Sequence, residues 1–352
     1  MSLETVWFLL IAILWGGYFL LEGFDFGVGM LLPFLPRGEE ERQTMFDAIG
    51  PVWDGNEVWL IVAGGATFAA FPVWYATMFS GFYLALLLVL LCLMVRVVSF
   101  EWRGKGSSDR WRAAWQWANT AGSAGAAFVW GVALSNLLRG VPIDSSGDFS
   151  GDFWSLFSPY TVFAGVVTVL LFAFHGANYL ELRVSGALRE RAAEAARRLA
   201  APVALAGIAL LGWTVAVAVD SNDRGVLGPA VPAALGAAAL VAAALFARGR
   251  RGGAAFVATA LATLALVATI FTGLYPRVLV SSTDFSNSLT ISNASSSHYS
   301  LQVMTVVAAV MVPIVLLYQA WSYHVFRARL GGEKVGSPID ALAAKPDEPS
   351  AP

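Results

Sequence analysis

The sequence contains little charge and almost no cysteine. Only 13% of its 352 residues are charged and 57% are hydrophobic, whereas about 25% of a soluble domain is charged. The formal net charge of -2 leaves no basic surface large enough to bind nucleic acid. The single cysteine, Cys92, excludes an internal disulfide and a cysteine-ligated zinc or iron–sulfur site within the chain. Composition therefore predicts an all-α polytopic membrane protein that does not bind nucleic acid.

Long apolar runs predict about nine transmembrane helices, because about 20 helical residues cross about 30 Å of hydrocarbon. The first run begins almost at Met1, is too long for a signal-peptide core and lacks a small-residue cleavage site, so we expect it to be retained. A helical domain, 1–330, would precede a cytoplasmic tail, 331–352, whose Gly, Pro, Ala and charge predict disorder. The runs lie at 6–34, 51–73, 75–99, 113–138, 158–182, 200–219, 229–247, 253–275 and 300–327.

Two further patterns predict how these helices are arranged. GYFLLEG in the first run is echoed by ANYLELR in the fifth, which favours two four-helix bundles plus one peripheral helix. Lys and Arg occupy alternate links, with 18 on one side against three on the other. By the positive-inside rule, the N-terminus lies outside and the C-terminus in the cytoplasm.

Four carboxylates lie within or at the edge of the first two spans. Glu22 and Asp25 are spaced i, i+3, as are Asp54 and Glu57, so each pair occupies one face of a helix. A charge near the middle of a bilayer costs roughly 2.5–3.5 kcal/mol and usually has a function. The predicted orientation places all four on the cytoplasmic side.

Each of these charges has a plainer interpretation as well. Asp54 and Glu57 could simply complement the dipole of the helix that they begin. Glu22 and Asp25 lie too deep for that, and form either a proton relay or a buried ion pair. Arg96 is their natural cationic partner, or else a snorkelling anchor at the membrane surface.

Histidine and tryptophan add two candidates. His175 is interpreted as a proton or hydrogen-bond station, or as a polar helix-packing contact. His175 and His324 differ in depth by roughly 10 Å, so a haem held by both is not favoured and no metal site is expected on this chain. Most tryptophans fit interfacial belts, but Trp59, two residues after Glu57, lies deeper.

The chain resembles subunit II of the cytochrome bd quinol oxidases from about Tyr18 to Trp321. The resemblance implies a terminal oxidase of aerobic respiration and electron transport, which oxidises membrane quinol and reduces dioxygen to water in the bacterial cytoplasmic (inner) membrane. The motifs that carry it are GGYFLLEGFDFGVGML, GPVWDGNEVWL, FPVWYATMFSGFYLALLLVL followed by FEWRGK, HGANYLELR, and SLTISNASSSHYSLQVMTVVAAVMVPIVLLYQAW.

The resemblance also implies how the cofactors and roles of the complex are divided between its subunits. Haem b, haem d and the quinol-oxidising loop belong to subunit I, so we expect no catalytic residue on this chain. Its role would be to support subunit I and to line a cytoplasmic proton path. Some members contain a small single-helix accessory subunit, and some bind a structural quinone in subunit II.

Individual residues match family positions. Asp54 matches the proposed proton-uptake aspartate, Asp25 and Arg96 match other buried charged positions, and Trp59 matches a position beside a proposed apolar channel for dioxygen. The predicted relay has Asp54 at its mouth, Glu57 beside it, and Asp25 and Glu22 deeper, with Arg96 offsetting their charge.

Two other roles stay open from the sequence. A proton-coupled secondary transporter would use the same acids to bind a coupling ion near the midplane, and predicts helices broken by mid-span Gly or Pro. The first span has mid-span glycines, but Pro313 is the clear mid-span proline. Alternatively, the acids would serve only as ion pairs to subunit I.

Overall fold

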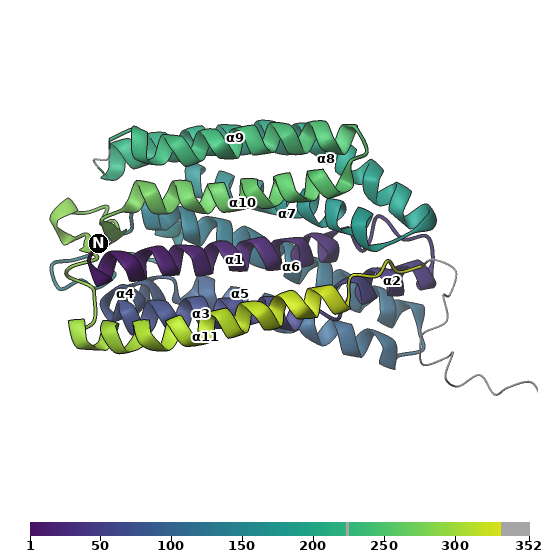
Figure 1. Cartoon of the computed structure of the whole chain (residues 1–352), viewed down its shortest axis with the longest axis horizontal. Helices are drawn as coiled ribbons and strands as arrows, with labels where there is room; N and C mark the ends of the chain where they lie inside the picture. The colour runs from purple at the N-terminus through teal and green to yellow at the C-terminus, as the bar shows by residue number, and fades with distance from the viewer. Residues whose placement is uncertain (223–224, 332–352) are drawn as a thin grey trace, which may run out of the picture.

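The computed structural model describes residues 1–222 and 225–331, and its helices run side by side along one axis (Figure 1). Arg224, Lys334, Lys345 and all of the predicted disordered tail except Gly331 lie outside these residues. The elements in chain order are α1 (Leu3–Leu31), α2 (Glu39–Ile49), α3 (Trp53–Ala70), α4 (Pro72–Gly81), α5 (Tyr83–Trp102), η1 (Arg103–Lys105), α6 (Asp109–Arg139), η2 (Phe153–Leu156), α7 (Pro159–Arg183), α8 (Gly186–Asn222), α9 (Leu227–Arg248), α10 (Gly252–Leu274), β1 (Arg277–Leu279), η3 (Phe285–Asn287), β2 (Leu289–Thr290) and α11 (His298–Val325).

The all-α polytopic class is confirmed. Among the described residues, eight helices are long and apolar enough to cross a membrane, namely α1, α5 with η1, α6, α7, α8, α9, α10 and α11. The remaining predicted span, 51–73, corresponds to α3, which has 18 residues. Asp54, Asn56 and Glu57 in its first turns lower the hydropathy of this helix, which is not among the eight.

The predicted boundary between the second and third spans is wrong. Residues 75–99 do not form one helix, because α4 ends at Gly81 and α5 begins at Tyr83. A Ser80–Gly81 pair stands at this break, and such pairs are frequent sites of helix kinks. The earlier break at Phe71 (φ -133°, ψ 70°) arises because the residue before a proline, here Pro72, is disfavoured in helical conformation.

Two helical segments were not predicted. The charged link after α1 contains α2, whose first turn holds three glutamates that complement the helix dipole. Its other face buries Met45, Phe46, Ala48 and Ile49. Similarly, α8 begins at Gly186, well before the predicted start at residue 200, so its charged N-terminal part projects beyond the apolar run.

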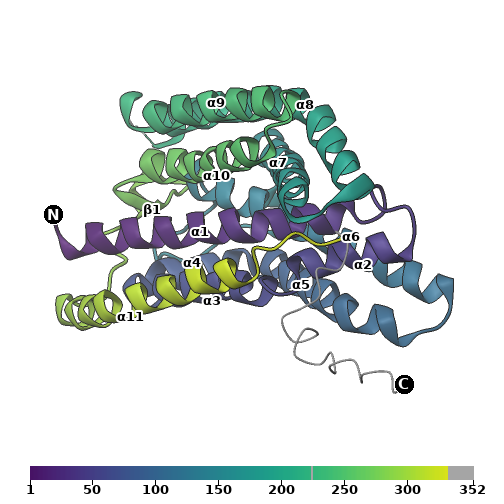
Figure 2. The ribbon, with the colours of Figure 1, turned by 45° about the vertical axis from the view of Figure 1, so that its right-hand side comes forward.

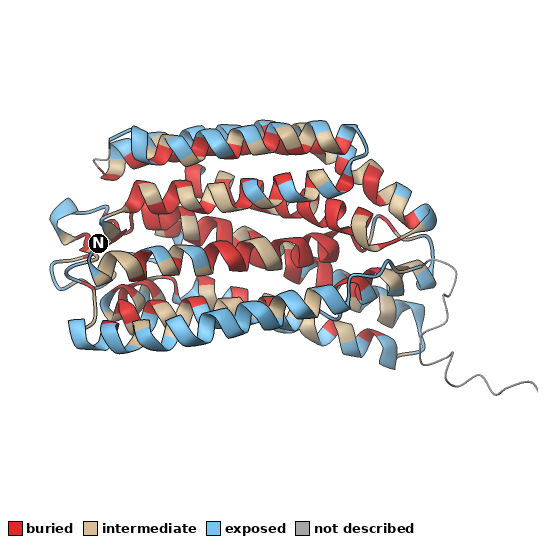
Figure 3. Ribbon diagram, viewed as in Figure 1, coloured by how far each residue is buried: buried red, intermediate tan, exposed pale blue. Residues whose placement is uncertain are grey.

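The sequence echo favours two groups of helices, α1, α3, α5 and α6 on the one hand and α7, α8, α9 and α10 on the other, but contacts do not separate them. Helix α6 contacts α7 nearly as extensively as it contacts α5, and α1 contacts both α7 and α10, so the division into two bundles stays a prediction. Helix α11 lies outside both groups against α1 and α3 (Figure 2). Most of its length is exposed (Figure 3), and Leu301 alone among its residues, all of which are described, is buried.

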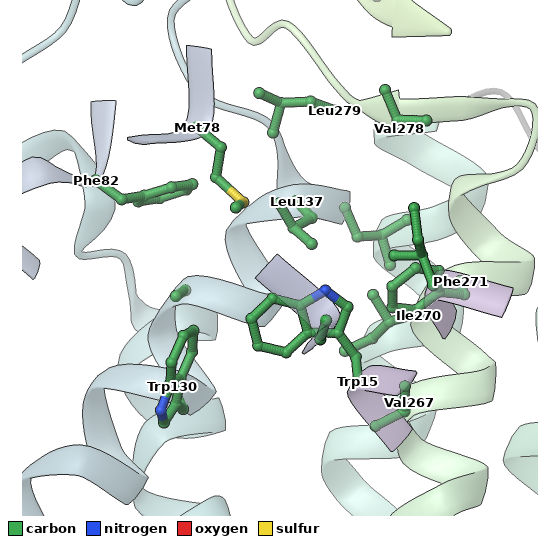
Figure 4. Packing of buried hydrophobic residues seen from close by; sticks show 14 of the residues in the cluster. Trp15, Met78, Phe82, Trp130, Leu137, Val267, Ile270, Phe271, Val278 and Leu279 are labelled. Carbon is green, nitrogen blue, oxygen red and sulfur yellow. The ribbon is translucent and has the colours of Figure 1, made fainter. Parts of the chain in front are cut away.

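Aromatic side chains fill the centre of the first group. Trp15 of α1 faces Trp130 of α6 with their ring centroids 5.2 Å apart, while Phe82, Met78 and Leu137 surround them (Figure 4). Rings at this separation and tilt attract one another beyond the burial of their apolar surface.

Helices α1 and α7 approach each other closely at a pair of glycines. A Cβ added at Gly27 would lie 2.0 Å from the carbonyl oxygen of Phe172 and 2.8 Å from the Cα of Gly176. Small residues allow such backbone contact between membrane helices. Glycine at these two positions therefore fixes the distance between α1 and α7.

Irregular segments cap both ends of the bundle. At the end that carries α2, here called the α2 end, the Leu330 amide donates to the Arg183 carbonyl at 2.8 Å. At the opposite end the Val141 amide donates to the Val280 carbonyl at 3.0 Å, which joins the link after α6 to the link before α11. Because Val141, Ile143 and Val280 are buried, both links pack against the bundle at these residues.

Candidate functional site

Arg96 of α5 is the centre of a buried charge cluster. Its side chain is fully buried and forms an ion pair with Glu22 of α1. The Oε2 atom of Glu57, from α3, lies 3.9 Å from the Arg96 Nη1 atom. The guanidinium also faces the Phe26 ring, 4.9 Å from its centroid. Arg96 is therefore not a snorkelling anchor, because a snorkelling side chain keeps its charge in water.

Asp25, one turn after Glu22 on α1, is also fully buried. Its Oδ2 atom accepts a hydrogen bond of 2.7 Å from the Nδ2 atom of Asn56 on α3. The Oδ1 atom has no hydrogen-bond partner among the described residues. Asp25 is thus held by an amide rather than by a direct ion pair.

The cluster contains more acid than base. Glu22, Asp25 and Glu57 supply three carboxyl groups, and Arg96 supplies one guanidinium. An unpaired charge in a dry interior is costly. Charge balance here therefore requires protons, or a cation from beyond the described residues. A group of carboxyls that shares too few cations is suited to holding and exchanging protons.

Asp54 lies apart from the buried cluster. It is exposed in the first turn of α3 and makes no capping hydrogen bond at that N-terminus. Glu57 follows one turn later with its side chain 20% exposed, and Glu22 beyond it is fully buried. The acids are thus graded in depth from the surface of the α2 end to the interior.

Helix α11 contributes two polar residues that sequence reasoning missed. The Asn56 Oδ1 atom accepts hydrogen bonds from the Tyr323 hydroxyl at 2.7 Å and from the Gln319 Nε2 atom at 3.2 Å. Gln319 and Tyr323 are spaced i, i+4 on α11, and that spacing could have identified them as one polar face of the helix. Asn56 therefore connects Asp25 to α11.

Trp59 lies against α1. A Cβ added at Gly17 would approach the Trp59 ring to 2.2 Å, and the Trp59 Nε1 atom donates to Gln319 Oε1 at 3.3 Å. A mainly apolar cavity of about 550 Å³ lies nearby and is lined by Trp15, Leu60, Ile61, Gly64, Gly65, Phe68, Tyr75, Met78, Phe79, Tyr83, Leu86, Leu87, Val89, Leu90, Leu93 and Trp130. Trp59 itself does not line this cavity, although its neighbour Leu60 does.

His175 belongs to a separate contact on the α7 side of α1. It is fully buried, with Nδ1 2.6 Å from the Thr259 hydroxyl and Nε2 3.2 Å from the Leu20 carbonyl. The Phe256 ring stacks on the imidazole with centroids 4.5 Å apart. Both ring nitrogens are engaged and one face is covered, so His175 does not fit a haem ligand in this arrangement. These are the contacts of a polar packing residue.

The other histidines do not complete a metal site. His324 is exposed at the end of α11 beside Arg327, and His298 is exposed at the start of α11 beside Gln302. In residues 1–222 and 225–331, no group of three or more His, Cys, Asp or Glu side chains is arranged to hold a metal ion. The described part of the chain therefore offers no metal site built from three or more such side chains.

Comparison with known proteins identifies the family. Residues 3–326 match the family model described as cytochrome bd terminal oxidase subunit II. The cytochrome bd ubiquinol oxidase subunit 2 of Bacillus subtilis is 42% identical over 94% of this chain and 97% of its own length. The cytochrome bd-I ubiquinol oxidase subunit 2 of Escherichia coli is 39% identical over 95% of this chain and 96% of its own length.

A solved structure shares the fold. A chain in the structure of bd oxidase from Geobacillus thermodenitrificans superposes with a TM-score of 0.73 over 92% of this chain and 97% of that chain, at 18% identity. The architecture, the buried charge cluster and the sequence matches over nearly the whole chain lead to one conclusion. This chain belongs to the cytochrome bd terminal oxidase subunit II family and is a membrane-spanning subunit of such an oxidase.

Proposed function

We propose that this chain is the haem-free second subunit of a bd-type quinol oxidase and that it lines a proton path toward the site where dioxygen is reduced to water. Family membership implies a subunit I partner, haem in the complex and a place in the bacterial inner membrane. The proposal adds that haem b and haem d reside on subunit I, and that quinol is oxidised there. The observation that carries the proton path is the gradation of carboxyl groups from exposed Asp54 to buried Glu22.

The proposed path begins at Asp54, which takes protons from water at the α2 end. Glu57, one helical turn further and partly exposed, receives them next and lies within 3.9 Å of Arg96. Glu22 and Asp25 then hold protons in the interior, and Arg96 compensates the charge of one carboxylate at a time. Since the cluster has three acids and one arginine, a proton can enter or leave without removing the ion pair that holds α1 against α5.

Asn56 has a positioning role in this proposal. Its Nδ2 group donates to Asp25, while Tyr323 and Gln319 hold its Oδ1 atom. These contacts fix the orientation of the amide, so one Asp25 oxygen is held and the other is left available for a proton. Helix α11 thus controls the geometry of Asp25 through Asn56.

The arginine distribution supports the proposed orientation. Arg37, Arg103, Arg183, Arg191 and Arg251 all lie at or near the α2 end, where η1, α2 and the starts of α8 and α10 are found. The positive-inside rule makes that end cytoplasmic, with the N-terminus outside. Protons would then be drawn from the cytoplasm.

The apolar cavity beside α3, α4 and α5 supports a second part of the proposal. A space of about 550 Å³ lined mostly by aliphatic and aromatic side chains suits an apolar guest. We assign it to a structural quinone or to dioxygen on its way to the haem. Trp59 lies next to Leu60, which lines the cavity, and would shape the nearby end of that route.

Replacing Asp54 tests the proton path. Asp54→Asn removes the titratable group at the surface and should lower oxygen consumption per haem to below about one tenth, since positioned proton transfer is commonly worth a factor of 100 or more. Haem absorption and the yield of the assembled complex should stay unchanged, because Asp54 is exposed.

The matched control is Asp109→Asn, which removes an exposed acid from the first turn of α6 and should leave turnover intact. Unchanged turnover in Asp54→Asn would remove Asp54 from the path. If Asp54→Asn lowered assembly while turnover per haem stayed normal, the acids would instead be structural ion pairs to subunit I.

A further inference from the structure

A groove at the α2 end lies between the end of α1 and the N-terminal part of α8, away from the charge cluster. Its volume is about 520 Å³. One part of its wall is apolar, and the other part carries three arginines. The lining residues are Leu31, Phe34, Leu35, Arg37, Arg191, Glu194, Ala195, Arg198 and Leu199.

The groove crosses the expected edge of the hydrocarbon layer. Leu31 is the last residue of α1, and Leu199 stands at the start of the apolar run of α8. Arg37 lies beyond the apolar end of α1, and Arg198 directly precedes the apolar run of α8. The apolar wall is therefore at the depth of lipid chains and the arginines are at the depth of lipid headgroups. Phe34, with 70% of its surface exposed, is available for contact with a chain.

The arginines at the groove are not neutralised by their neighbours. Arg191 pairs with Glu41. Glu194 is shared by Arg197 and Arg198, at 2.5 and 2.8 Å. The Arg37 side chain makes no direct ion pair or hydrogen bond with the described residues, although its charge also acts on Glu41, and the Arg198 side chain is 78% exposed. The two glutamates Glu41 and Glu194 are thus shared by four arginines, namely Arg37, Arg191, Arg197 and Arg198. This leaves an excess of two positive charges around the groove.

We propose that this groove binds an anionic phospholipid. The phosphate would lie between Arg37 and Arg198, and an acyl chain would follow Leu31, Phe34 and Leu199. A phosphodiester oxygen accepts hydrogen bonds from guanidinium groups well, and basic pockets between membrane helices commonly hold anionic headgroups. The apolar wall distinguishes the site from one for a small soluble anion, which would gain nothing from Phe34 or Leu199.

The test uses the purified two-subunit oxidase, titrated with phosphatidylglycerol or phosphatidylcholine of identical chains and read by native mass spectrometry. The variant is Arg37→Gln with Arg198→Gln. It leaves no carboxylate unpaired, because Arg197 still contacts Glu194 and Arg191 still pairs with Glu41. The matched control is Arg110→Gln with Arg251→Gln, two exposed arginines at the same end but outside the groove.

The dissociation constant for phosphatidylglycerol should rise roughly 30-fold in the groove variant, about fivefold for each arginine removed, and stay within about twofold in the control. Ala195→Trp, which fills the groove and keeps every charge, should weaken binding as well. Equal retention of phosphatidylglycerol by wild type and groove variant would overturn the proposal. An equal loss of phosphatidylglycerol affinity in the control variant would show that general surface charge, and not the groove, binds the lipid. Displacement of the lipid by millimolar inorganic phosphate would show that the site binds a soluble anion instead.

Discussion

Replacing Arg96 is the most direct way to test how the charge cluster is held together. Arg96→Met keeps the approximate length and apolar contacts of the side chain but removes the guanidinium that pairs with Glu22 and approaches Glu57. Glu22 is fully buried, so no water can replace its partner. Removing one member of a buried pair typically costs about 3–5 kcal/mol.

A double substitution separates the pair from its surroundings. Glu22→Gln removes one carboxylate but leaves Arg96 near Glu57, so its cost should be about 1.5–3 kcal/mol, the usual value of a hydrogen bond to a charged group. Combining Arg96→Met with Glu22→Gln removes both charges. The double variant should be more stable than Arg96→Met alone by about 2 kcal/mol, since contacting residues show coupling of this size.

Heating the purified complex at one fixed rate, with the intact fraction measured by size exclusion, provides the assay. At about 2–4 °C per kcal/mol, Arg96→Met should lower the apparent midpoint by about 6–20 °C. Arg112→Met, which breaks the exposed pair with Asp109, serves as the control and should shift it little, because surface pairs contribute about 0–1 kcal/mol. If the costs of Arg96→Met and Glu22→Gln simply added, the two residues would not be energetically paired and the reasoning would be refuted.

Two further predictions concern packing and pH. Gly27→Ala should destabilise the complex strongly, by about 1–3 kcal/mol or more, because its Cβ would meet the backbone of α7. The control is Gly212→Ala, where a Cβ meets nothing within 4 Å. Equal apparent midpoints of thermal unfolding for the two variants would contradict the close approach of α1 and α7. Burial raises the pKa of Glu39, but its hydrogen bond and ion pair with Arg103 and its pair with Arg42 outweigh this and leave the pKa below its ordinary value. Burial likewise raises the pKa of Glu41, and the Arg37 amide and Arg191 lower it further than burial raises it. Both folded-state pKa values lie below the unfolded ones, so the stabilisation of α2 by these two ion pairs is present above about pH 4.5 and is lost as the pH falls further. The hydrogen-exchange protection of Met45–Ile49, corrected for intrinsic rates, should therefore fall at low pH. Glu41→Gln should lower that protection already at neutral pH, and protection that did not change with pH would show that these ion pairs do not hold α2.

The sequence carried enough information to predict most of the helices, because apolar runs of membrane length are unambiguous. It also indicated Arg96 as the cationic partner of Glu22 and Asp25, and in the structure Arg96 forms its ion pair with Glu22. Helix α2 escaped detection because its eleven residues are largely polar and its buried face is short. The break at Ser80–Gly81 escaped because hydropathy does not register a local turn within a continuous apolar run.

The sequence predicted the acidic residues of the candidate site but not the uncharged polar residues that contact them. Charges within an apolar span are conspicuous, whereas Asn56, Gln319 and Tyr323 resemble ordinary polar residues until the fold brings α3 and α11 together. His175 is the opposite case. A buried histidine suggests a functional role, but its contacts with Thr259 and Leu20 are enough to explain why it is buried. Family membership replaces the transporter alternative, which the sequence alone left open.

The position of α11 has a consequence for how the protein is made. Among the described helices α11 is translated last, yet it supplies both groups that hold the Asn56 Oδ1 atom. The strand-like segment behind it also joins Leu330 to Arg183 and Ser185. Until the ribosome has released α11, Asn56 and Asp25, to which Asn56 donates a hydrogen bond, lack the contacts that this helix provides. A chain that terminated before α11 would therefore present an incomplete, charged membrane interior to the proteases that remove defective membrane proteins.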